Sequence, residues 1–246
     1  MEHEPLKLKQ LFSKIKFLIL DCLFPIFCYG CEKEGSYICE TCRAALQFLP
    51  PSCIICTKIV FSQKKNPPGK TCRACRSHTY VDTFCSPFLF KNSLIRTLIH
   101  DFKYRRARFL APFFAELFFE YMRYYRITLP ERAILVPIPL SYKRERLRGF
   151  NQSLLVVEHL AKLLSSEYAL DALGKAKETK PQAGLLGEER HENVRGVFYA
   201  KKLDKISGRV VVLFDDVKTT GATLEEAAQI LREAGAQKIW VFTIAH

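Results

Sequence analysis

The segment that most constrains the fold is VVLFDDVKTTGAT, residues 211–223. A run of apolar, mostly β-branched residues ends there in two adjacent carboxylates, Asp215 and Asp216. The small residues Thr219-Thr220-Gly221 follow, and a helical pattern begins at Ala222. The segment therefore predicts a strand, a tight loop and a helix. The acids would lie at the carboxyl end of the strand, where ligands bind in open α/β sheets.

The loop and the acid pair point to different halves of one ligand. A loop of small residues that opens a helix presents backbone N–H groups to a phosphate, and the helix dipole favours the negative charge. Two carboxylates repel phosphate, so we expect them to face the vicinal hydroxyls of a ribose. The segment thus predicts a site for ribose 5-phosphate. The alternative is an ordinary strand–turn–helix with a threonine N-cap and solvated acids.

The cysteines predict structural zinc. Eight of the ten fall into four Cys-x-x-Cys pairs, a spacing that lets two sulfurs converge on one ion, whereas disulfides would need an oxidising compartment. Pairing by sequence gives two four-cysteine sites, although an interleaved arrangement also satisfies the spacing. The first site would be Cys28, Cys31, Cys39 and Cys42, and the second Cys53, Cys56, Cys72 and Cys75.

Composition indicates a soluble protein with an acidic partner. The 246 residues are 48% hydrophobic and 26% charged, with a formal net charge of +13. No segment reaches the roughly 18 apolar residues of a membrane-spanning helix. We therefore expect a cytoplasmic protein without a stable membrane span.

Alternating strand and helix patterns predict an α/β fold with a mostly parallel sheet flanked by helices. The expected domains are an amino-terminal helix, 1–24, a double zinc ribbon, 25–78, and the α/β domain, 79–246. Within that domain we expect strands at 83–90, 133–138, 209–214 and 238–244, and helices at 92–102, 109–125, 150–164 and 223–234.

Two basic segments are candidates for binding a pyrophosphate. The first, SYKRERLRGFNQ at 141–152, is expected to form a loop that carries Lys143, Arg144 and Arg148 beside the acid pair. The second, 179–197, holds Arg190 and has the length of a mobile lid. The alternative for the first segment is a solvated basic loop.

The segment around the acid pair resembles the ribose-phosphate signature of type I phosphoribosyltransferases. That resemblance implies that Asp215 and Asp216 hold the ribose 2- and 3-hydroxyls of phosphoribosyl pyrophosphate (PRPP), and that Mg²⁺ accompanies the ligand. The residues implied for the 5-phosphate cradle are Lys218, Thr219, Thr220, Gly221, Ala222 and Thr223.

A wider set of ordered motifs is similar to the ComF family of competence proteins. The motifs are Pro-x-Pro-Leu, Arg-Gly-Phe-Asn-Gln, Pro-Gln-Ala-Gly-Leu, Arg-x-x-Asn-Val-Arg-Gly and Asp-Asp-Val-x-Thr-Thr-Gly-Ala-Thr, behind the double zinc ribbon. The resemblance implies a phosphoribosyltransferase-like fold and a role in DNA uptake and the handling of single strands. Two functions stay open: a phosphoribosyltransferase, or a non-catalytic module that binds single-stranded DNA or senses PRPP. The basic stretch 91–108 favours nucleic acid contact.

Overall fold

The computed structural model describes residues 25–61, 66–176 and 196–246. The expected amino-terminal helix, 1–24, and most of the expected lid, Arg190 included, lie outside the described residues. The chain divides into two compact units, residues 1–47 and 48–246. In the first unit the described residues form one short helix, α2 (Glu40–Ala44), which begins after Cys39.

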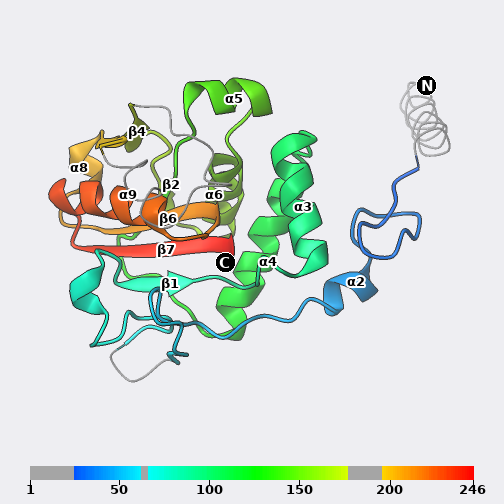
Figure 1. The fold of residues 1–246 in the computed structure, drawn as a ribbon, viewed down its shortest axis with the longest axis horizontal. Helices are drawn as coiled ribbons and strands as arrows, with labels where there is room; N and C mark the ends of the chain where they lie inside the picture. The colour runs from blue at the N-terminus through cyan, green and yellow to red at the C-terminus, as the bar shows by residue number, and fades with distance from the viewer. Residues whose placement is uncertain (1–24, 62–65, 177–195) are drawn as a thin grey trace, which may run out of the picture. The chain divides into compact units, whose positions relative to one another are not determined.

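The second unit is built on a five-stranded sheet in the order β1-β7-β6-β2-β3, in which all neighbours are parallel (Figure 1). A separate antiparallel pair, β4 and β5, lies outside this sheet. The strands are β1 (Thr83–Cys85), β2 (Ile134–Pro137), β3 (Glu167–Tyr168), β4 (Leu173–Lys175), β5 (Phe198–Ala200), β6 (Val210–Val217) and β7 (Lys238–Ala245).

Helices connect the parallel strands, as crossover connections require. They are α3 (Ser93–Tyr104), α4 (Leu110–Tyr124), α5 (Tyr142–Arg148), α6 (Gln152–Leu164), α8 (Leu203–Ile206) and α9 (Ala222–Glu233). A 3₁₀ helix, η1 (Arg76–His78), precedes the first strand. No helix in the described ranges is long and apolar enough to cross a bilayer.

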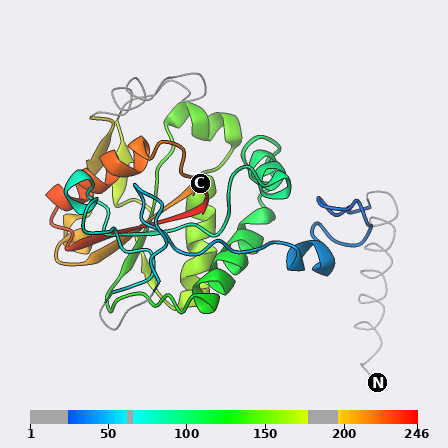
Figure 2. The ribbon, with the colours of Figure 1, turned by 60° about the horizontal axis from the view of Figure 1, so that its bottom comes forward.

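Both faces of the central strands are covered, which explains why β6 is apolar at consecutive positions rather than alternate ones. On one face, Val211 and Leu213 belong to a buried cluster with the apolar residues of α9. On the other, the Phe118 ring of α4 lies 5.7 Å from Phe214 and 4.7 Å from Phe242. Figure 2 shows α9 on one side of β6 and β7, with α4 and α6 on the other.

The predicted fold class is confirmed: a mostly parallel sheet with helices on both faces. The predicted N-cap is also found, because the Asn92 side chain accepts a hydrogen bond from the Ile95 N–H at the start of α3. The first strand is shorter than expected, since β1 ends at Cys85 rather than at residue 90.

The loop predicted for residues 141–152 is wrong, because Tyr142–Arg148 form helix α5. This helix buries none of its side chains. It therefore lacks the apolar stripe by which a helix is found in a sequence. Gly149 ends it with a φ of 80°, a left-handed conformation that glycine adopts without strain.

Candidate functional site

The acid pair lies near the carboxyl end of the central strand, β6. Strand β6 continues through both aspartates to Val217, which pairs with Ala245 of β7. Because side chains alternate along a strand, Asp215 and Asp216 leave opposite faces of the backbone. Asp216 is 8% exposed and Asp215 is half-buried.

Each aspartate has its own partners. The Asp215 Oδ1 accepts hydrogen bonds from the Ser153 hydroxyl of α6 at 3.1 Å and from the Asp216 backbone N–H at 2.9 Å. The Asp216 Oδ1 lies 2.7 Å from the Lys103 Nζ of α3. Asp216 is thus held by an ion pair with a helix 113 positions earlier in the chain.

Burial and the neighbouring charge of Asp216 raise the pKa of Asp215 from 3.8 to about 7, against the opposing effects of Lys103 and Ser153. A carboxylate that titrates near neutrality is costly to keep ionised in the free protein. Such groups are concentrated at sites where a ligand supplies the missing interactions.

The loop after β6 opens helix α9 as predicted. Gly221 occupies the N-cap position with a φ of 87°, where any other residue would be strained. The Thr220 hydroxyl accepts a hydrogen bond of 3.4 Å from the Ala222 N–H. The loop therefore turns sharply enough to point the first amides of a twelve-residue helix at the end of the strand.

A hollow of about 200 Å³ brings most of the predicted residues together. It is lined by the acid pair, by the loop that follows it and by two arginines of α5; the predicted residues among its lining are Asp215, Asp216, Lys218, Thr219, Gly221, Thr223, Arg144 and Arg148. Lys143, Thr220 and Ala222 adjoin these residues in the chain but do not line the hollow. The structure thus assembles acids, helix amides and guanidinium groups around one space.

Arg148 is held in place rather than extended into solvent. Its Nη1 donates to the Gln152 Oε1 at 2.9 Å, and its guanidinium lies 5.4 Å from the centre of the Tyr104 ring. Asn151 fixes the following helix, since its side chain accepts from the Leu154 N–H and donates to the Ile138 carbonyl. The α5–α6 junction is therefore rigid where it faces the hollow.

Among the lining residues that sequence reasoning did not assign to the site are Lys103, Lys175 and Phe90. Burial, followed by the charge of Arg144, lowers the pKa of Lys175 to about 8, while Asp215 opposes that shift. Lys103 was visible only as one cation of a basic stretch, and Lys175 is the last residue of the three-residue strand β4, which carries no motif. Neither carried a sequence signal for its position, because long-range packing alone brings them to the acid pair.

The cysteines form two groups, each with the geometry of a metal site. In each group all four Sγ atoms lie within 4.8 Å of one another. Cys31 and Cys39 are 3.6 Å apart at sulfur, and Cys56 and Cys72 are 3.7 Å apart. Four thiolates at zinc–sulfur distances around one ion would be about 3.8 Å apart. Pairing by sequence is confirmed, and the interleaved arrangement is not formed.

Backbone amides support the sulfurs in the first group. The N–H groups of Gly30 and Cys39 each approach the Cys28 Sγ at 3.4 Å. Burial would raise the pKa of the Cys28 thiol, but these amides outweigh it and lower the pKa to about 6. The amides therefore favour the thiolate of Cys28, which is the form that binds metal, whereas hydrogen bonds with Cys31 and Cys39 raise the pKa of Cys42 to about 12.

Comparison with known proteins agrees with this geometry. Residues 151–246 match the model of the phosphoribosyl transferase domain, the part of the chain that contains the acid pair and its loop. The match and the parallel sheet define the class: an α/β protein with a phosphoribosyltransferase domain.

The relatives narrow the class to a family. The chain is 28% identical to competence protein F of Haemophilus influenzae over 225 residues, 89% of each protein. It is 33% identical to competence protein ComFC of Bacillus subtilis over 158 residues, 62% of this chain and 60% of that one. It is also 33% identical to the DNA utilization protein YhgH of Escherichia coli K12 over 151 residues, 60% of this chain and 65% of that one. These relatives support the resemblance to the ComF family that the ordered motifs predicted.

Among solved structures, a glutamine PRPP amidotransferase from B. subtilis aligns with a TM-score of 0.35 and 20% identity. The alignment covers 56% of this chain and 26% of that one.

Proposed function

We propose that the chain binds PRPP with Mg²⁺ in the hollow at the end of β6, as a phosphoribosyltransferase-type protein of DNA uptake. The observation that carries the proposal is the convergence of three kinds of group on one space: two carboxylates, the amides of a helix N-terminus, and the cations of α5. A phosphorylated ribose with a second phosphate group matches all three, because each kind of group binds a different part of it.

The residues divide by the chemistry they offer. Asp215 and Asp216 accept hydrogen bonds from the ribose hydroxyls, and the loop 218–223 donates backbone N–H groups to the 5-phosphate. Arg144 and Arg148 donate to the pyrophosphate, where two charged donors stabilise the negative charge that develops as it leaves. Mg²⁺ supplies a hard cation for oxygen ligands of the pyrophosphate and the ribose.

Lys103 has to release Asp216 before both carboxylates can contact a ribose. In the free protein its ammonium lies 2.7 Å from Asp216 and narrows the hollow to about 200 Å³, less than is usual for a small-ligand site. A ligand that brings hydroxyls to the acids and phosphates to the cations exchanges both partners of this ion pair. Lys103 then becomes a further donor to phosphate, while the ribose hydroxyls donate to the carboxylate that it leaves.

The two cysteine groups hold structural Zn²⁺ in this proposal. Four cysteine ligands fill the coordination sphere of each ion and leave no open position for water, so the ions have a structural role. In the second unit, the group formed by Cys53, Cys56, Cys72 and Cys75 fixes the ribbon that precedes β1.

Calorimetry with Asp216→Asn tests the proposal. We expect magnesium PRPP to bind the wild-type chain and the exposed-acid control Asp204→Asn alike, and to bind Asp216→Asn at least tenfold more weakly, because a charged hydrogen-bond partner is lost. Equal affinity for all three proteins would refute the role of the acid pair. A screen for PRPP-dependent pyrophosphate release across bases and amines then separates a transferase from a PRPP sensor.

A further inference from the structure

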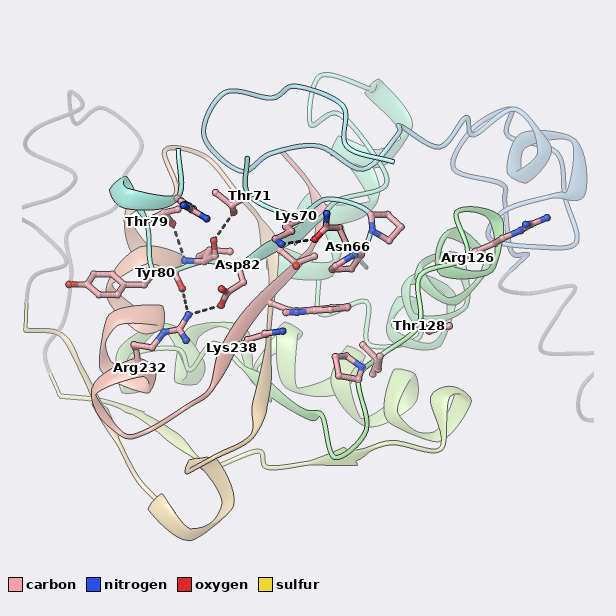
Figure 3. Close-up of a pocket in the computed structure, with 18 residues that line it drawn as sticks. Asn66, Lys70, Thr71, Thr79, Tyr80, Asp82, Arg126, Thr128, Arg232 and Lys238 are labelled. Carbon is pink, nitrogen blue, oxygen red and sulfur yellow. Dashed lines mark hydrogen bonds and ion pairs between the residues drawn. The ribbon is translucent and has the colours of Figure 1, made fainter. Parts of the chain in front are cut away.

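A second and larger hollow lies at the opposite edge of the sheet, where β1 and β7 begin. Its volume is about 760 Å³, within the range of small-ligand sites (Figure 3). Thr83 and Lys238, the first residues of the two strands, line it. It shares no lining residue with the hollow at the acid pair, so whatever it binds is independent of that site.

We call this larger hollow the basic pocket. One of its walls is formed by residues of the cysteine ribbon, among them Pro67, Lys70 and Thr71. The Thr71 N–H donates to the Asp82 carbonyl at 2.8 Å and the Phe84 N–H to the Gly69 carbonyl at 2.9 Å, so the ribbon adds an extended segment beside β1. The contact is close: a Cβ on Gly69 would lie 2.1 Å from the Phe84 carbonyl oxygen. Cys72, which follows Thr71 directly, belongs to the second cysteine group. The wall is therefore formed before any ligand arrives.

The charge of the basic pocket is strongly positive. One carboxylate, Asp82, lines it, and that group already accepts from Arg232 at 2.5 Å and from the Ile239 N–H at 2.8 Å. Figure 3 shows Lys70 and Lys238 on facing sides of the pocket, whereas the Arg126 side chain points away from both. Against the one acid stand five cations: Lys70, Arg76, Arg126, Arg232 and Lys238. The excess of cations selects for an anion, and phosphate is the anion that such groups bind best.

The rest of the lining mixes polar side chains, most of them threonines, with apolar ones. Trp240 forms part of it and is 3% exposed, with its ring backed by Phe242 at 6.4 Å between ring centres. The rings of Pro67, Pro68 and Pro130 line the pocket as well. The partly exposed rings of Pro67 and Pro130 offer apolar surface that a planar ring can cover and inorganic phosphate cannot. The combination of cations with apolar rings is the chemistry that binds a nucleotide.

We infer that the basic pocket is a second binding site, specific for a nucleoside phosphate. The phosphate contacts Lys70 and Lys238, and the base lies between the proline walls beside Trp240. The unit can be a free nucleotide or one nucleotide of a single strand, since both offer the same phosphate and base. The inference does not depend on PRPP binding at the acid pair.

The chain contains its own reporter for this site, because Trp240 is its single tryptophan. We would titrate the metal-replete full chain with AMP, with a single-stranded deoxyadenosine oligonucleotide, and with inorganic phosphate, and follow the tryptophan emission. The expected result is a saturable change with AMP or the oligonucleotide, at concentrations at least tenfold below those needed for phosphate. A response to AMP alone identifies a free nucleotide, and a response to the oligonucleotide alone identifies a strand.

The matched variants remove two positive charges each. Lys70→Gln/Lys238→Gln should weaken the response roughly tenfold or more, because two charged donors to phosphate are lost. Lys201→Gln/Lys205→Gln, away from the pocket, should leave it within about twofold of wild type. Asp216→Asn should keep the full response, so that failure of this site and failure of the PRPP site give different results. No emission change with either nucleotide, equal binding by both double variants, or phosphate binding as tight as nucleotide would overturn the inference.

Discussion

Asp215→Asn should stabilise the free protein at alkaline pH. The pKa of Asp215 rises from 3.8 to about 7 on folding, so the folded state holds its proton more tightly than the unfolded chain does. At about 1.4 kcal/mol per pKa unit, the three-unit rise sets a ceiling of about 4 kcal/mol. Because the side chain is only half-buried, solvent screens the effect, and about 2 kcal/mol is the expected gain.

The sign of the pH dependence follows from linkage. Below the unfolded pKa both states are protonated and the aspartate carries no penalty. As the pH rises from about 4 to about 7, the unfolded chain ionises first, and wild-type stability is lost progressively. Asparagine does not ionise, and its side-chain oxygen can still accept from Ser153 and from the Asp216 N–H. The advantage of the variant should therefore grow with pH and level off above about 7.

Urea denaturation measures this difference. At about pH 8 the variant should be about 2 kcal/mol more stable than wild type, and at about pH 5.5 about half of that. The control Asp204→Asn removes an exposed carboxylate and should shift stability by less than about 0.5 kcal/mol at either pH. A variant that is less stable than wild type at pH 8, or whose advantage does not change with pH, would refute the raised pKa of Asp215.

Three further perturbations test other parts of the account. Lys103→Met leaves Asp216 without its ion-pair partner in a largely buried position, and chemical denaturation should show a loss of about 2–3 kcal/mol; an unchanged midpoint would mean that the pair is not formed in solution. Gly221→Ala should cost about 1–2 kcal/mol and weaken PRPP binding, whereas Gly208→Ala, also at positive φ but away from the hollow, should cost as much and leave affinity unchanged. Cys53→Ser should lower the metal content from two ions per chain to one by elemental analysis, and a wild-type content below one would contradict both metal sites.

Much of the fold could be predicted from the sequence because the patterns that specify it involve residues close together in the chain. Consecutive apolar residues in β6, the Asn92 cap of α3 and the spacing of the cysteine pairs each act within a few residues, and each prediction is confirmed by the structure. Helix α5 was missed because a short helix that buries none of its side chains leaves no periodic pattern.

The site was predictable only in part for the same reason. The acid pair and its loop form one continuous motif, so they could be found together. Lys103, Lys175 and Phe90 come from α3, from β4 and from the loop before α3, and only the packing of these elements around β6 brings them to the acids. The basic pocket is hidden in the same way, since its two walls are distant in sequence.

The most direct test of the central claim compares whole and half ligands by calorimetry in the presence of Mg²⁺. If the acids hold the ribose, the loop holds its 5-phosphate and the α5 arginines hold the pyrophosphate, then PRPP should bind at one site, more tightly than ribose 5-phosphate or pyrophosphate. Each of the two fragments should also compete with it. Pyrophosphate that binds as tightly as PRPP, together with ribose 5-phosphate that does not compete, would contradict the claim.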